Sequence, residues 1–131
     1  MTSTYQKGLF NPVGARLVKY TQTYPDAGVP LSETQIDATG GSLIAIQIDN
    51  SANGTTNAYL KLWIGSAPTP DIGDEPKYVF KAPPGTNLQY TFNPPISFGA
   101  AATHAVFTTE AKTAARTSPA GNTTAHIMYG V

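Results

Sequence analysis

The side chains that could bind a metal ion are few in this 131-residue sequence. Asp71, Asp74 and Glu75 lie close together in a proline-bounded stretch, and their oxygens could hold Ca²⁺, but the twelve-residue Ca²⁺-loop pattern is missing. His104 and His126 fall in two expected strands, and antiparallel pairing of these strands would bring the imidazoles together. Neither HxH nor HExxH spacing is present to supply further ligands. We therefore predict no metal site and interpret the three acids as solvated loop carboxylates.

No set of residues suited to catalysis stands out. The sequence has no cysteine and no GxSxG, and two histidines among seven serines are expected by chance. The eight acidic residues lie mostly in expected loops, which argues against a glycosidase pair. The segment 39–42 (TGGS) has two glycines but neither a lysine nor a following helix, so it does not resemble a phosphate-binding loop. We predict that the protein is not an enzyme and binds no cofactor.

The charge content excludes some partners and favours others. Only 12% of the residues are charged, about half the usual fraction, and the formal net charge is zero. A nucleic-acid-binding protein would need a basic face, and no apolar run is long enough for a membrane helix. Residues 1–8 lack a signal-peptide profile, so we expect synthesis in a cytoplasm without export. Sparse charge favours burial of surface in an assembly, although abundant Thr, Ser, Asn and Gln could also keep a monomer soluble.

Short runs of strand-forming residues follow one another between 23 glycines and prolines. Seven or eight such strands at roughly ten-residue spacing predict an all-β fold, a single β-sandwich or jelly roll. The expected strands span residues 13–20, 42–49, 57–64, 77–82, 88–92, 96–98, 103–109 and 123–129.

The strands 42–49 and 57–64 are expected to form a central hairpin, because Asn53-Gly54 between them is the strongest turn signal in the chain. Alternation in the second strand places Leu60 and Leu62 inward, and Lys61 and Trp63 on the opposite face.

The aromatic residues Trp63, Tyr59, Tyr78 and Tyr90 allow two interpretations. They could form an exposed platform for stacking on a sugar, as in carbohydrate-binding β-sandwich modules. The favoured interpretation is that they fill the second face of a sheet or an interface, where amphipathic aromatic residues are common. Trp63 and Tyr78 are therefore candidate interface residues.

The domain is expected to span residues 13–131, preceded by an extended N-terminal arm at 1–12. Tyr5, Leu9 and Phe10 are candidate anchors of this arm on a neighbouring chain. The alternative is that Leu9 and Phe10 cover one end of their own sandwich.

Residues 40–131 resemble small virion structural proteins of tailed phages. The resemblance rests on YLKLW at 59–63, the proline-bounded loop at 68–76, PPG at 83–85, ISFG at 96–99, AVF at 105–107 and AHIMY at 125–129. Trp63 stands where that pattern has tyrosine, and Asp74-Glu75 makes the loop more acidic than the pattern.

The resemblance implies a non-enzymatic capsid decoration (cement) protein of the virion, synthesised in the host cytoplasm. Its implied partners are further copies of itself, with a homotrimer as the best guess, and the major capsid protein or other virion proteins. A tail, baseplate or fibre component is the alternative within this class, and a carbohydrate-binding module is the alternative from another class.

Deleting residues 1–10 tests the arm. If the arm docks on a neighbouring chain, the deletion weakens subunit or capsid association, and the melting temperature of the dissociated domain stays nearly unchanged. A large fall in that melting temperature, measured by circular dichroism, would instead place Leu9 and Phe10 in the chain's own core.

Overall fold

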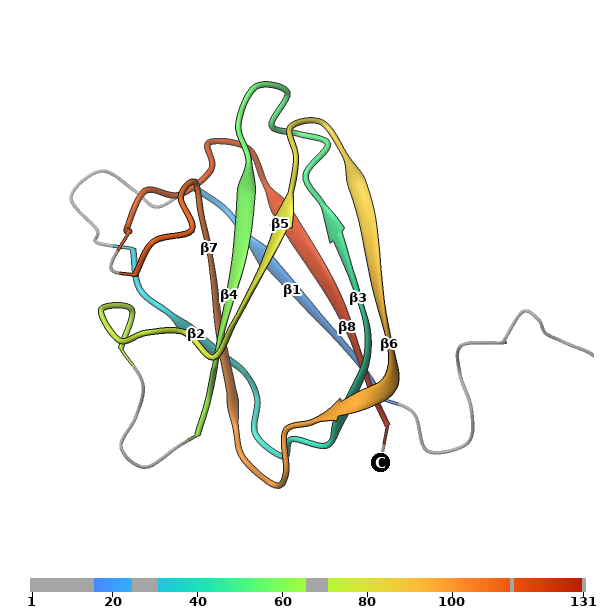
Figure 1. Cartoon of the computed structure of the whole chain (residues 1–131). Coiled ribbons are helices and arrows are strands. Elements are labelled where there is room, and N and C mark those ends of the chain that lie inside the picture. The colour runs from blue at the N-terminus through green and yellow to red at the C-terminus, as the bar shows by residue number, and fades with distance from the viewer. Residues whose placement is uncertain (1–15, 25–30, 66–70, 114, 131) are drawn as a thin grey trace, which may run out of the picture.

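A computed structural model describes residues 16–24, 31–65, 71–113 and 115–130 of the chain. These residues form eight strands in two four-stranded antiparallel sheets that face each other (Figure 1), so the predicted all-β sandwich is confirmed. The first sheet has the order β1 (Arg16–Gln22), β8 (Thr123–Gly130), β3 (Ser42–Asp49), β6 (Asn87–Ser97). The second has the order β2 (Thr34–Asp37), β7 (Thr103–Thr108), β4 (Ala58–Ile64), β5 (Tyr78–Ala82).

The chain changes sheet at almost every connection between these strands. Among the eight, only β4 and β5 follow each other within one sheet. As a result β1 lies across from β2 on one side of the sandwich, and β6 lies across from β5 on the other.

The expected hairpin between residues 42–49 and 57–64 is wrong. β3 pairs with β6 and β8, whereas β4 pairs with β5 and β7 in the opposite sheet. The segment that contains Asn53 and Gly54 is therefore a crossing between the two sheets. β3 and β4 each have most of their apolar residues on one face, and the crossing turns these two faces toward each other across the core.

Two buried asparagines hold this crossing together. The Asn50 amide donates to the carbonyls of Thr56 at 3.0 Å, Ala82 at 3.1 Å and Pro83 at 3.1 Å, and its oxygen accepts from Asn53 at 2.8 Å. Asn53 also accepts from the backbone N–H of Gly121 at 2.7 Å. These bonds join the crossing to the β5–β6 turn and to the segment entering β8.

The core lies between the sheets, and in β4 it follows the predicted alternation. Leu60 and Leu62 are fully buried in it, and Tyr129 closes one end. The other fully buried apolar side chains of this cluster are Leu43, Ile46, Ile48, Ala58, Ala82, Ala105, Phe107, Ala125 and Ile127.

Two further details differ from the expected strands. Residues 34–37, which lie outside all of the expected strands, form the short edge strand β2. The separate strands expected at 88–92 and 96–98 are one strand, β6, whose pairing with β3 is shifted by an irregularity after Thr91.

Substituting Asn50 tests the crossing. Asn50→Ala leaves several buried carbonyls without a donor, and we expect it to lower the free energy of unfolding by about 2–3 kcal/mol. The matched control is Asn87→Ala, because the Asn87 side chain is exposed at the start of β6, and its expected effect is below about 0.5 kcal/mol. Urea denaturation measures both; equal losses would contradict the role given to Asn50.

Candidate binding surface

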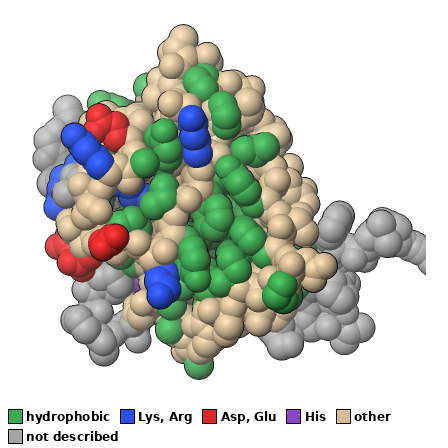
Figure 2. Space-filling view, viewed as in Figure 1, with side chains coloured by type: hydrophobic (Ala, Val, Ile, Leu, Met, Phe, Trp, Pro, Cys, Tyr) green, Lys and Arg blue, Asp and Glu red, His purple; other side chains and the backbone are tan. Residues whose placement is uncertain are grey.

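The sandwich is incompletely covered on the side where β5 lies across from β6. Figure 2 shows hydrophobic side chains gathered over β5 and the space between it and β6. We call this surface the open side, and its apolar residues are half-buried: Tyr78, Phe80, Tyr90, Phe92 and Ile96. Their rings pack on the core but keep part of their surface exposed to solvent.

The aromatic rings of the open side contact one another in a continuous row. Phe80 lies between Tyr90 at 5.4 Å and Phe92 at 5.6 Å, measured between ring centroids. Tyr78 stacks on Phe98 at 5.7 Å, and Phe98 is buried against Tyr129 at 5.9 Å. The Tyr90 hydroxyl donates to the Lys81 carbonyl and so ties β6 to β5 near their connecting turn. The open side is thus a fixed aromatic surface and can serve for binding.

The strand β6 that borders the open side differs from the other edge strands. Among the described strands, β1, β2, β5 and β6 are edges. Each of the first three carries at least one charged residue, whereas β6 (NLQYTFNPPIS) carries none. Charged residues on an edge strand oppose pairing with another chain. The segment of β6 before Pro94 lacks that protection.

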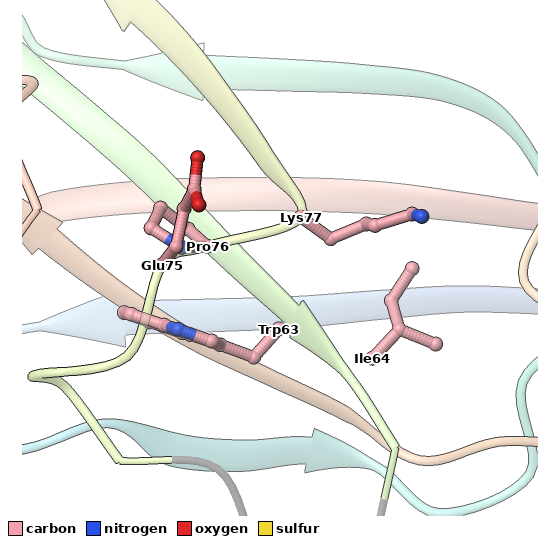
Figure 3. A pocket seen from close by; sticks show the side chains of 5 residues that line it. All are labelled: Trp63, Ile64, Glu75, Pro76 and Lys77. Carbon is pink, nitrogen blue, oxygen red and sulfur yellow. The ribbon is translucent and has the colours of Figure 1, made fainter.

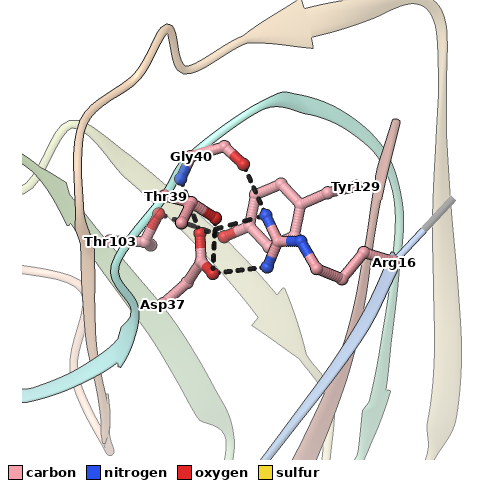
Figure 4. Close-up of polar contacts among 6 residues, drawn as sticks. All are labelled: Arg16, Asp37, Thr39, Gly40, Thr103 and Tyr129. Atoms are coloured by element: carbon pink, nitrogen blue, oxygen red, sulfur yellow. Dashed lines mark hydrogen bonds and ion pairs between the residues drawn. The ribbon is translucent and has the colours of Figure 1, made fainter. Parts of the chain in front are cut away.

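The opposite side of the sandwich is closed by polar bonds (Figure 4). Arg16 of β1 forms an ion pair with Asp37 at the end of β2, and its guanidinium also donates to the Gly40 carbonyl. The guanidinium lies over the Tyr129 ring, 4.8 Å from its centroid. Asp37 further accepts from the Gly40 N–H at 2.8 Å, where Gly40 has a positive φ of 75°. Sequence reasoning missed this group, because the two charges lie in different strands.

Gln22 closes the far end of the same side. Its amide donates to the Phe107 carbonyl at 2.7 Å and accepts from the Phe107 N–H at 2.8 Å. Pairing of β2 with β7 begins at Thr34 and Ala105, so it does not reach Phe107. The side chain of Gln22 therefore replaces the backbone partner that the short strand β2 does not supply.

Trp63, one of the predicted interface residues, is covered by its own chain. It is 3% exposed, packs with Leu31, Ile72 and Val106, and donates its indole N–H to the Asp74 carbonyl at 3.0 Å. It thus fills the outer face of the second sheet. A hollow of about 400 Å³ lies beside it, lined also by Ile64, Glu75, Pro76 and Lys77 (Figure 3).

Lys61 is also buried on this outer face. Its ammonium donates to the Lys112 carbonyl at 2.6 Å, and burial lowers its pKa while Glu110 opposes that change. The alternation placed Lys61 beside Trp63 on this face, but nothing in the pattern indicated that later segments of the chain cover both.

The remaining candidates do not come together. His104 lies in β7 and His126 in β8, in opposite sheets, so these strands do not pair and the imidazoles are not brought together. Asp74 accepts from the Asp71 N–H at 2.9 Å within a loop turn, while Arg116 lies 3.8 Å from Asp71. Among the residues that the structure describes, no three His, Cys, Asp or Glu side chains are placed to hold a metal ion.

The other predicted interface residues fall in two parts of the chain. Tyr78 lies on the open side, as described above, whereas Tyr5, Leu9 and Phe10 lie outside the described residues.

Within the described ranges, no helix has the length and hydrophobicity needed to cross a membrane.

A scan of protein-family models, a search of curated proteins and a search of solved structures each found no match to this chain.

The ion pair on the closed side predicts a pH dependence. Burial raises the pKa of Asp37, but the hydrogen bonds from Arg16 and the backbone, together with the charge of Arg16, outweigh burial and hold the pKa below its ordinary value. The ionised form is therefore favoured by folding. This contribution is present above about pH 4 and is lost as the pH falls through the lowered pKa.

Asp37→Asn should therefore lower the free energy of unfolding by about 1–3 kcal/mol at pH 7. The difference from the unsubstituted protein should shrink as the pH falls toward about 3. Urea denaturation at both pH values measures it. A difference that stays constant with pH would show that the charge of Asp37 does not contribute.

Proposed function

We propose that the protein is a non-enzymatic structural protein of a tailed-phage virion, a decoration protein that stabilises the capsid shell through contacts between subunits. It associates with itself, with three copies as the expected number, and binds the major capsid protein. The single observation that supports binding to other proteins best is the open side: a half-exposed row of aromatic rings on a chain in which only 12% of the residues are charged.

The chemistry of the open side suits contact with protein. Tyrosine and phenylalanine are enriched at the centres of protein interfaces, and charged residues are depleted there. On the open side the rings are already held by contacts with one another and by the Tyr90 hydroxyl, so little side-chain freedom is lost when a partner covers them.

Shell stabilisation then follows by mass action. A protein that binds only the assembled shell raises the stability of the shell by RT ln(1 + [L]/Kd) for each site. Association of several copies multiplies the contacts of one decoration unit and raises its avidity. This mechanism needs no catalytic group. It depends on binding surface alone.

The alternatives make different demands on the structure. A tail, baseplate or fibre component would use the same surface, and cosedimentation with capsids distinguishes it from a decoration protein. A carbohydrate-binding module needs an exposed ring face for stacking, and Trp63, the largest candidate, is 3% exposed. Tyr78 and Tyr90 are half-buried within the aromatic row. These positions favour the protein contact over the sugar site.

Placing a charge on the open side tests the proposal. Phe92→Lys puts an ammonium among the rings near Phe80, and covering it with a partner costs desolvation. We expect self-association and capsid binding to weaken by about tenfold to a hundredfold, equivalent to roughly 1.4–2.8 kcal/mol. Light scattering measures the first, and cosedimentation with capsids lacking the protein measures the second.

The matched control is Leu17→Lys, because Leu17 is 60% exposed on the outer face of the first sheet. It introduces the same charge away from the open side and should leave association unchanged. Thermal unfolding of both variants shows whether the sandwich is intact. Equal weakening by the two substitutions, or a monomeric unsubstituted protein that binds no capsid, would contradict the proposal.

A further inference from the structure

We infer that the free edge of β6 pairs with the same edge of a second copy of this chain. In this arrangement residues 87–91 of the two copies run antiparallel about a twofold axis, and the two first sheets join into one. The inference rests on the self-association proposed above and names the strand that carries it.

The backbone of β6 presents a regular row of hydrogen-bonding groups along its outer edge. Among the described strands, β6 pairs with β3 alone, and along residues 87–91 that pairing has no irregularity. Directly before this stretch, the Asn50 N–H donates to the Thr86 carbonyl at 2.8 Å. Because the direction of these groups alternates along an antiparallel ladder, Leu88 and Tyr90 also direct theirs toward β3. The odd-numbered residues of 87–91 therefore direct their N–H and C=O groups away from the sheet.

Charge distinguishes β6 from the other edge strands as a partner for its own copy. Pairing about a twofold axis sets a strand against itself, so it brings charged residues close to the same residues of the other copy. β1 carries Arg16 and Lys19, β2 carries Asp37, and β5 carries Lys81. β6 carries no charged residue, so its self-pairing has no such cost.

One register of this pairing matches the side chains on both faces of the sheet. With Gln89 on the twofold axis, the two copies of Gln89 face each other, and Asn87 of each copy faces Thr91 of the other. These uncharged polar side chains are exposed on the outer face. On the inner face, Leu88 of one copy lies beside Tyr90 of the other. Polar groups thus meet polar groups outside, and apolar groups meet apolar groups within.

Pairing in this register satisfies backbone groups and covers apolar surface at the same time. Residue 89 faces its own copy and residue 87 faces residue 91, and each of these pairs exchanges two hydrogen bonds. Leu88 and Tyr90 are half-buried in the single chain, so contact across the axis removes more of their surface from water. The Tyr90 hydroxyl already donates to the Lys81 carbonyl, which holds the ring in place.

The sequence after Thr91 ends the pairing segment. The pairing of β6 with β3 shifts there, and Pro94 and Pro95 have no N–H to donate to a further strand. The contact is therefore short and relates two copies. Contacts among three copies would use other surfaces, and both kinds of contact together give an even number of chains.

Cysteine cross-linking of full-length chains tests the inference, because the chain has no cysteine of its own. In the proposed register the Cα atoms of the two copies of residue 89 are about 5.5 Å apart, a separation that a disulfide spans. Gln89→Cys is incubated with oxidised glutathione, and the covalent dimer is measured on a non-reducing gel.

The matched control is Thr91→Cys, because Thr91 is also exposed and lies on the same face of the same strand. In the proposed register the two copies of residue 91 are about 13 Å apart along the strands, too far for a disulfide. We expect several-fold more covalent dimer from Gln89→Cys than from Thr91→Cys. An equal or greater yield from Thr91→Cys overturns the inference.

Light scattering of the unsubstituted protein separates this failure from failure of the proposed function. The inference expects an even number of chains. A monomer, or an assembly of three chains, would remove the twofold pairing, and binding of that protein to capsids would leave the decoration role standing. A protein that neither associates nor binds capsids would contradict the proposed function itself.

Discussion

The side-chain amide of Asn50 holds the point at which the chain leaves one sheet for the other. Its bonds reach the crossing itself and the β5–β6 turn, and its oxygen fixes Asn53, which in turn holds the entry to β8. Because all of these connections change sheet, their backbone groups lose the partners that a hairpin would give them. Two buried amides supply those partners. This end of the sandwich therefore depends on Asn50 and Asn53 for hydrogen bonds that its connections do not make to one another.

Most of the strands were predictable, because they depend on local alternation. Their pairing was not predictable, because it depends on distant segments. Ile46 lies in β3 and Leu62 in β4, and the sequences of these two strands fit a hairpin as well as they fit two opposing sheets. The Asn53-Gly54 signal describes a turn and says nothing of the direction in which the chain continues. In a hairpin, both apolar faces would lie on the same side of one sheet. The two strands lie in opposite sheets because β6 and β8 pair with β3, whereas β7 pairs with β4.

The same reasoning explains which parts of the candidate site could be found from the sequence. Trp63 and Lys61 were placed correctly on the outer face of their strand, but the segments that bury them come from elsewhere in the chain. The role of Gln22 depends on β2 being too short to reach Phe107, which no pattern around Gln22 reveals. The absence of charged residues from β6 can be seen in the sequence. That this absence leaves a sheet edge open to pairing follows only from the topology, which makes β6 an edge strand.

The two sides of the sandwich are closed by different kinds of interaction, and this difference decides where a partner can bind. On the side of β1 and β2, Arg16, Asp37 and Gln22 form directional bonds that a partner would have to break. On the side of β5 and β6, packed rings such as Phe80 and Phe92 lose no directional bond when another apolar surface covers them. Binding at the open side adds contacts without removing any, so the open side is where the fold can associate at the lowest cost to its own stability.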